Sequence, residues 1–246
     1  MERAEERATA AGFGLLSASV LAVAIVVAAV VFGIFHYRSR AARDTIQVTG
    51  AATQPFESDI VKWRLTLARP VPSGELAAGY AGLARDLERV RGWLEAGGMT
   101  FEDIGVQPVN AYPSFDQFGN RVGYNLNQSL YAISRDVERL ESLALNPAEL
   151  IAGGMVLESS QLEYFYSQLD SLKHQLLATA TEDARRRAEE IAGGSGMAID
   201  RIASARAGVF QITEPFSTEV SDFGVHNTAT RKKEITVTVH TTFVVD

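Results

Sequence analysis

The segment Val61-Lys62-Trp63-Arg64-Leu65-Thr66-Leu67 alternates apolar and polar side chains without interruption. Successive side chains of a β-strand point to opposite faces, so this period of two predicts a strand with one buried face. The end of the chain repeats the pattern. These two segments predict a core built on half-buried strands. The apolar positions of the second segment are Ile235, Val237, Val239, Phe243 and Val245.

Prolines mark the expected ends of the first of these strands. Gln54-Pro55 predicts a turn that separates it from a shorter strand at Ile46 and Val48. Pro70-Val71-Pro72 is expected to end the strand, and Ser73 to cap the helix that follows.

Two long amphipathic segments predict helices that cover the sheet. Apolar residues at alternating spacings of four and three predict the first helix, and its stripe is Leu76, Tyr80, Leu83, Leu87, Val90 and Leu94. The second helix is expected from about Leu169 to Ala192, and its buried face is Leu172, Leu176, Ala180, Ala184, Ala188 and Ile191. We therefore expect an α+β fold in which a mostly antiparallel sheet packs against two long helices.

Two connecting segments of the body are long and contain few apolar residues that could hold them in the core. Residues 112–121 are expected to form the extended tip of a hairpin that carries Tyr112, Phe115 and Phe118. These aromatic side chains either bind a partner or fold back as a plug, and the sequence leaves both alternatives open. Residues 213–233 form a long polar connection, which is unusual within a compact domain unless it has a function.

A run of 28 uncharged residues, from Ala8 to Phe35, precedes the body. A helix of about 20 apolar residues crosses the hydrocarbon core of a bilayer and satisfies its own backbone hydrogen bonds there. The run is longer than the apolar core of a signal peptide and no Ala-x-Ala site follows it, so we expect a retained anchor. The expected organisation is a tail (1–11), a transmembrane anchor (12–37), a linker (38–44) and one α+β domain (45–246).

The basic residues beside the anchor bear on its orientation. Arg3 and Arg7 precede it, whereas Arg38, Arg40 and Arg43 follow it. Counted by the positive-inside rule, these residues lean weakly toward a cytoplasmic body.

Composition narrows the classes of function. The formal net charge is −7 and basic residues form no large cluster, which argues against a nucleic-acid partner. The chain has no cysteine, and this excludes disulfides, thiolate catalysis and cysteine-based metal sites. The four histidines, His36, His174, His226 and His240, lie far apart, so we expect no metal site.

One segment has the look of a catalytic motif. Gly193-Gly194-Ser195-Gly196-Met197 resembles a nucleophile elbow, but it follows a predicted helix, and Met197 replaces the final glycine. A helix C-cap explains these residues better. We expect no catalytic residue, no cofactor and no enzymatic activity.

Several segments, in their order along the chain, resemble the SIMPL-domain family of bacterial envelope proteins. They include Ile46-Gln47-Val48-Thr49-Gly50, Gly123-Tyr124 and the helical stretch from Ala184 to Ala192 that leads into a glycine turn. Two further segments, from Gly208 to Ile212 and from Glu219 to Gly224, resemble a membrane-anchored branch of that family. The resemblance implies an α+β fold, an extracytoplasmic body and self-association into rings or channel-like assemblies. It also implies a general link to envelope stress, and it carries no catalytic residues.

These observations lead to one functional hypothesis and two rivals. We expect a non-enzymatic protein anchored in the bacterial inner membrane by a single helix, whose periplasmic body self-associates. For the side of the membrane we follow the family rather than the small difference in arginine number. The alternative is a module that binds a small molecule or a protein partner in a pocket near Trp63 or Tyr131. A hydrolase would instead depend on Ser195, and we expect a Ser195→Ala change to have no effect.

Overall fold

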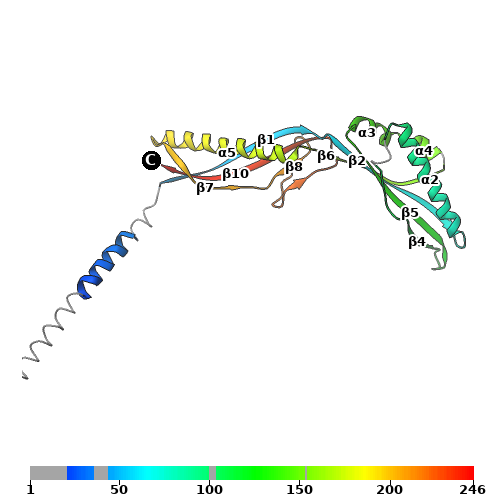
Figure 1. Cartoon of the computed structure of the whole chain (residues 1–246), viewed down its shortest axis with the longest axis horizontal. Coiled ribbons are helices and arrows are strands. Elements are labelled where there is room, and N and C mark those ends of the chain that lie inside the picture. The colour runs from blue at the N-terminus through cyan, green and yellow to red at the C-terminus, as the bar shows by residue number, and fades with distance from the viewer. Residues whose placement is uncertain (1–20, 36–43, 100–103, 153) are drawn as a thin grey trace, which may run out of the picture.

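The computed structural model describes residues 21–35, 44–99, 104–152 and 154–246. Residues 21–35 form a helix, and the strands and helices of the body follow it along the chain (Figure 1). Their bounds are β1 (Thr45–Glu57), β2 (Ile60–Pro72), α2 (Leu76–Ala96), β3 (Ile104–Val106), β4 (Asn110–Phe115), β5 (Arg121–Ser134), α3 (Val137–Leu145), α4 (Ala148–Ala152), β6 (Val156–Phe165), α5 (Leu169–Gly194), β7 (Ile199–Ala207), β8 (Gln211–Thr213), β9 (Val225–His226) and β10 (Lys232–Val245).

The expected anchor falls only partly on the described residues. The tail, residues 12–20 and 36–37 of the anchor, and residues 38–43 of the linker lie outside them. Among the residues described, no helix combines the length and the apolar character that a bilayer crossing requires. The anchor therefore stays a prediction from the sequence.

The strands of the body are divided between two five-stranded sheets. β1, β10, β8 and β9 form one sheet in that order, with β7 also paired to β10, and α5 lies along this sheet (Figure 1). β3, β5, β2 and β6 form the other, with β4 also paired to β5, and α2, α3 and α4 lie beside it. We call these units the first lobe and the second lobe. The α+β class and the mostly antiparallel pairing are confirmed, with β8 and β9 as the one parallel pair among the described strands, whereas the single sheet that we expected is wrong.

The chain passes from one sheet to the other at Ser58 and Asp59. The Ser58 backbone N–H donates to the Arg231 carbonyl of the first lobe at 3.0 Å, and that of Asp59 donates to the Phe165 carbonyl of the second at 3.1 Å. Burial alone would raise the pKa of Asp59, but hydrogen bonds donated by Ser167 outweigh it and lower that pKa. Consecutive residues thus pair with different sheets, and the alternation of side chains does not reveal this change of partner.

The expected turn at Gln54-Pro55 is wrong, because β1 continues through both residues. Pro55 lies opposite Glu234 of β10. Among the strands that the structure describes, β1 pairs only with β10 and is an edge strand of the first sheet. A proline that directs its nitrogen away from the single neighbour costs no ladder hydrogen bond, so the edge tolerates it.

The segment Pro70-Val71-Pro72 ends β2, as we expected, because Pro72 is the last residue of that strand. Pro70 and Pro72 pair with β5 alone, because the pairing of β2 with β6 ends at Ala68. With only one neighbour, this part of β2 also tolerates proline. Ser73 does not cap α2, since the N-cap is Glu75 and has no side-chain cap hydrogen bond.

The core of the second lobe lies between β2, β5 and the helices. Trp63 is fully buried, its ring lies 5.9 Å from that of Trp93, and its Nε1 donates to Ser160 Oγ at 2.9 Å. The predicted strand face is confirmed, and of the predicted helix stripe Tyr80 is 42 % exposed. The fully buried apolar residues here are Val61, Trp63, Leu65, Leu67, Leu83, Val90, Leu94, Leu126, Leu130, Ala132 and Leu140.

The first lobe brings α5 very close to β1. Ala180, Ala184 and Ala188 are fully buried against the sheet, as the sequence predicts, whereas Ile191 is 51 % exposed. Asp183 accepts a hydrogen bond from the Ala51 backbone N–H at 3.0 Å, and this bond lowers the pKa of that carboxyl. The small side chains allow the close approach, and the hydrogen bond fixes the position of the helix along β1.

The junction of the lobes contains a buried lysine. Lys233 of β10 is 2 % exposed, and its Nζ donates to the carbonyl of Tyr164 in β6. Burial lowers the pKa of Lys233 to about 8, well below the 10.5 of an exposed lysine. Burial and the neighbouring Glu141 carboxylate raise the pKa of Tyr164 to about 12.

From the lowered pKa of Lys233 we predict that the chain becomes more stable as the pH rises from 7 to 10. In that range the unfolded chain binds more protons at Lys233 than the folded chain, so the free energy of unfolding increases with pH, by about 2 kcal/mol. Tyr164 acts in the opposite direction, but only above pH 10. Urea unfolding at each pH measures the effect, and Lys233→Met is expected to remove it. Equal pH dependence in both proteins would contradict the prediction.

Candidate interaction surface

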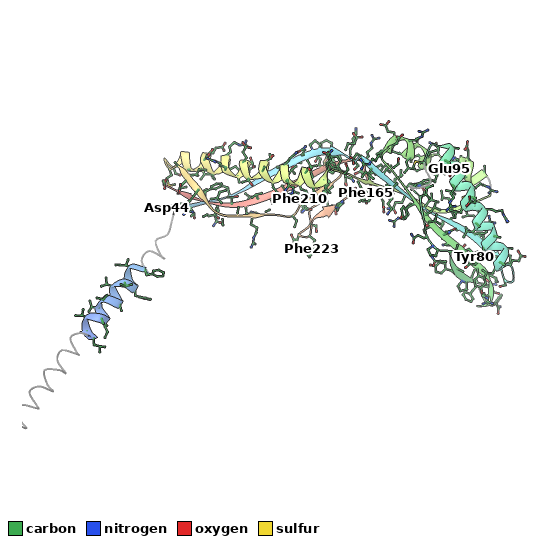
Figure 2. The ribbon with its side chains drawn as sticks, viewed as in Figure 1. Asp44, Tyr80, Glu95, Phe165, Phe210 and Phe223 are labelled. Carbon is green, nitrogen blue, oxygen red and sulfur yellow. The ribbon has the colours of Figure 1, made fainter. Side chains whose placement is uncertain are left out.

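The connection between β8 and β9 exposes large apolar side chains to an unusual degree. Phe216, Val220 and Phe223 are 94 %, 80 % and 97 % exposed. Phe223 lies at the outer end of this connection, away from the sheet (Figure 2). We call residues 214–224 the aromatic loop. Clustered exposed apolar residues are typical of interaction sites.

A side chain of the sheet fixes the aromatic loop. The Gln211 Nε2 donates to the Ser221 carbonyl at 2.7 Å. Its Oε1 accepts from the backbone N–H of Ser221 at 3.3 Å and from that of Val225 at 2.9 Å. These three hydrogen bonds tie the far end of the loop to β8, so the loop presents its side chains from a defined backbone.

Both phenylalanines occupy the third position of a turn. The Ser217 N–H donates to the Glu214 carbonyl across Pro215-Phe216, and Phe216 has a φ of 64°. Glycine is favoured at such a position. Among the described residues, Phe216 is the only one other than glycine that has a positive φ. A non-glycine residue in this conformation costs about 1 kcal/mol, so the structure retains a phenylalanine here against its backbone preference. Such strain points to a function for the side chain.

The charged residues of the aromatic loop are all acidic. The loop contains Glu214, Glu219 and Asp222 and no basic residue. Glu214 accepts a hydrogen bond from Asn227 Nδ2 at 2.6 Å, whereas Glu219 and Asp222 are exposed. A surface that receives this loop must combine apolar contacts with positive charge.

The tip of the β4–β5 hairpin is a second exposed aromatic site. Tyr112, Phe115 and Phe118 are 56 %, 59 % and 78 % exposed, so the plug alternative is wrong and these side chains face solvent. Asp116 accepts hydrogen bonds from Asn120 and from the Phe118 backbone N–H, and the bond from the Asn120 side chain lowers the pKa of that carboxyl most. The tip is therefore also an ordered turn.

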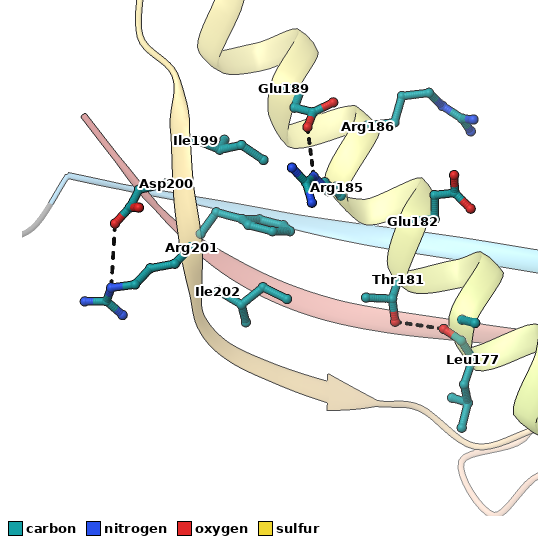
Figure 3. Close-up of a pocket in the computed structure, with 12 residues that line it drawn as sticks. Leu177, Thr181, Glu182, Arg185, Arg186, Glu189, Ile199, Asp200, Arg201 and Ile202 are labelled. Atoms are coloured by element: carbon teal, nitrogen blue, oxygen red, sulfur yellow. Dashed lines mark hydrogen bonds and ion pairs between the residues drawn. The ribbon is translucent and has the colours of Figure 1, made fainter.

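A groove of about 910 Å³ lies between α5 and β7 (Figure 3). Leu177 and Ile202 form its apolar sides and Phe243 lies at its base. Arg185 lies between the helix and the strand, where it pairs with Glu189 at 2.9 Å. Arg201 extends from the other side of β7, and its Nε is 3.6 Å from Asp200. We call this site the α5–β7 groove. Glu182 and Arg186 also line it.

The structure does not bring the candidate catalytic or metal-binding residues together. Ser195 is the C-cap residue of α5, as predicted, and its Oγ donates to the Ile191 carbonyl at 3.4 Å. His240 Nδ1 lies 2.9 Å from Thr49 Oγ1. Burial, with the charges of Lys233 and Lys173, lowers the pKa of His226. Within the described residues, which do not include His36, no three potential metal ligands cluster.

We expected a pocket near Trp63 or Tyr131, but at Trp63 the space is filled by packed side chains. The Trp63 side chain is fully buried and packs against Trp93. Tyr131 carries the Lys62 ammonium over its ring at 4.7 Å.

The α5–β7 groove was not expected from the sequence, because Leu177 and Ile202 come from separate elements. The aromatic loop lies within the predicted connection, where Pro215 before Phe216 and Gly224 after Phe223 are its local turn signals.

Comparison with known proteins places the body in a family. The family model SIMPL, described as a protein of unknown function (DUF541), matches residues 46–243. A search of curated proteins found no match. The family match spans both lobes, from the start of β1 almost to the end of β10. The chain therefore belongs to the SIMPL family.

Proposed function

We propose that this chain is a non-enzymatic protein of the bacterial envelope that self-associates through its body. The observation that carries the proposal is the aromatic loop, in which Phe216 and Phe223 are almost fully exposed on a fixed backbone. Burying one such side chain in a contact stabilises that contact by about 2 kcal/mol, and an isolated body lacks this stabilisation. The strained φ of Phe216 supports a functional role for its exposure.

The membrane anchor and the location are further parts of the proposal. The uncharged run from Ala8 to Phe35 supports a single transmembrane helix at the inner membrane. Membership in the SIMPL family, as the resemblance describes it, supports a body on the outer side. A shared membrane also favours association, because it raises the effective concentration of the tethered bodies. The net charge of −7 supports a protein partner rather than a nucleic acid.

One preparation tests both parts of this proposal. Intact spheroplasts that contain the full chain are treated with a protease, and a second portion is solubilised in mild detergent and sedimented. We expect the protease to digest the body from outside, and the solubilised chain to sediment as an oligomer. Replacing both Phe216 and Phe223 by serine is expected to reduce the oligomer.

The two readouts contradict different parts of the proposal. A body that is protected in intact spheroplasts but digested after lysis would place it in the cytoplasm. A full chain that sediments as a monomer over the whole accessible range of concentrations would overturn self-association. A Ser195→Ala variant is a control, and we expect it to behave as the unchanged chain in both measurements.

A further inference from the structure

We propose that the contact between copies is head-to-tail, with the aromatic loop of one copy seated in the α5–β7 groove of the next. This inference rests on the proposed self-association and assigns its two surfaces. It joins two features that lie on the same lobe and that face solvent in the isolated chain.

The loop cannot fill the groove of its own copy. β8, from which the loop departs, pairs with β10 at Glu234–Thr236, whereas the groove lies beside Phe243. Phe243 lies seven positions after Thr236 along β10, which is about 24 Å at the rise of an antiparallel strand. The Gln211 hydrogen bonds also hold the loop to β8. A second copy is therefore the source of a loop that reaches this groove.

The apolar parts of the two surfaces match in kind. Ile202 is 46 % exposed on β7, and together with Leu177 it forms the sides of a groove whose base is Phe243. Phe216 and Phe223 are almost fully exposed to solvent in the isolated chain. On docking, each ring would lose its contact with water and gain contact with the apolar side chains of the groove. The loop backbone is already ordered, so little conformational entropy is lost on docking.

The charges favour this groove over a lipid surface. Glu219 and Asp222 are exposed in a loop without basic residues, so anionic lipid headgroups would repel it. The groove offers the guanidinium group of Arg185, which lies between α5 and β7 and whose side chain is 67 % exposed. Its existing partner, Glu189, forms a surface pair of small energy with it, which a docking loop can replace or share.

The hairpin tip is a weaker occupant of the groove. Its Asp116 already accepts hydrogen bonds from within the tip, and Arg121 beside it has the opposite charge. The tip therefore has exposed aromatic residues without the excess of negative charge. This difference makes Phe118, which is 78 % exposed, a matched control for Phe223.

A contact between two different surfaces has a consequence that a two-fold contact lacks. Each copy uses its loop toward one neighbour and its groove toward the other, so copies add in one direction and form closed rings or open chains. One copy with a defective loop and another with a defective groove still share one intact contact. A two-fold contact would use the same surfaces on both copies.

Sedimentation of the full chain in mild detergent tests this arrangement with three variants. The loop variant is Phe216→Gly with Phe223→Ser, the groove variant is Ile202→Glu, and the control is Phe118→Ser. We expect the loop and groove variants each to raise the dissociation constant about thirty-fold or more, the equivalent of burying one phenylalanine. The control is expected to assemble as the unchanged chain does.

An equimolar mixture of the two defective variants provides the decisive measurement. We expect it to form dimers of one copy of each variant and nothing larger, whereas each variant alone stays monomeric. Thermal unfolding checks the fold of each. Phe216→Gly removes the positive-φ strain and is expected to leave stability unchanged or higher. Arg185→Glu, at an exposed helix position, replaces Ile202→Glu if that variant does not fold.

The outcomes separate this inference from the proposed function. If the unchanged chain is monomeric, both fail. If it assembles but the loop variant does too, or if Phe118→Ser alone abolishes assembly, self-association stands and the assigned surfaces are wrong. A mixture of the two defective variants that yields no mixed dimer excludes the head-to-tail contact and favours a two-fold one.

Discussion

A Gly50→Ala change is expected to lower the free energy of unfolding of the first lobe by about 3 kcal/mol. A Cβ atom at this position would overlap the backbone of α5 at Ala180 and Ala184 and would lie 2.7 Å from the Ala184 Cβ. These are backbone atoms and a rigid methyl group, so no rotamer change relieves the overlap. The helix must move away from β1, and this movement opens its whole alanine face.

Urea unfolding followed by far-UV circular dichroism measures this loss, because α5 is the longest helix of the body. The hydrogen bond from Ala51 to Asp183 would also lengthen, since it depends on the same approach. The matched control is Gly92→Ala in α2, where a Cβ atom meets nothing within 4 Å. There the change is expected to stabilise the helix by up to about 1 kcal/mol. Equal effects at the two glycines would show that the close packing of α5 is not what requires Gly50.

An Asp86→Ala change is expected to destabilise the second lobe by about 3 kcal/mol. Asp86 is 2 % exposed in α2, where its Oδ2 accepts from Arg69 Nε at 3.0 Å and its Oδ1 lies 3.6 Å from Arg89. Removing the carboxylate leaves the Arg69 guanidinium of β2 without its anion beneath the helix. The remaining exposure of Arg69, 33 % of its side chain, keeps the expected loss at the lower end for a buried pair.

Tryptophan fluorescence measures this loss selectively, because Trp63 and Trp93, the only two tryptophans of the chain, both lie in the second lobe. The control on the same helix is Glu88→Ala, which breaks an exposed pair with Arg91 at 2.9 Å. That change is expected to cost less than about 0.5 kcal/mol. If Asp86→Ala costs no more than Glu88→Ala, the buried pair does not hold α2 on the sheet.

The candidate site could be predicted only in part. The turn residues around Phe216 and Phe223 lie together in the sequence, and the long polar connection indicated a functional segment there. The strain at Phe216 depends on its φ, and the role of Gln211 depends on where β8 brings its side chain. Asp86 gave a signal that was missed, since it falls on the same helix face as Leu83 and Val90. The α5–β7 groove had no local signal.

The sequence by itself determined the type of each main element of the body. The period of two in β2 and β10, and the buried face of α5, follow from local geometry that a short segment displays. Only the tertiary structure decided which strands pair. β1 joins β10 from the other end of the chain, while β2, two residues after β1, joins a different sheet. Both strands expose the same kind of alternating surface, so the choice depends on packing between distant residues, such as Gly50 against α5, which no local pattern records.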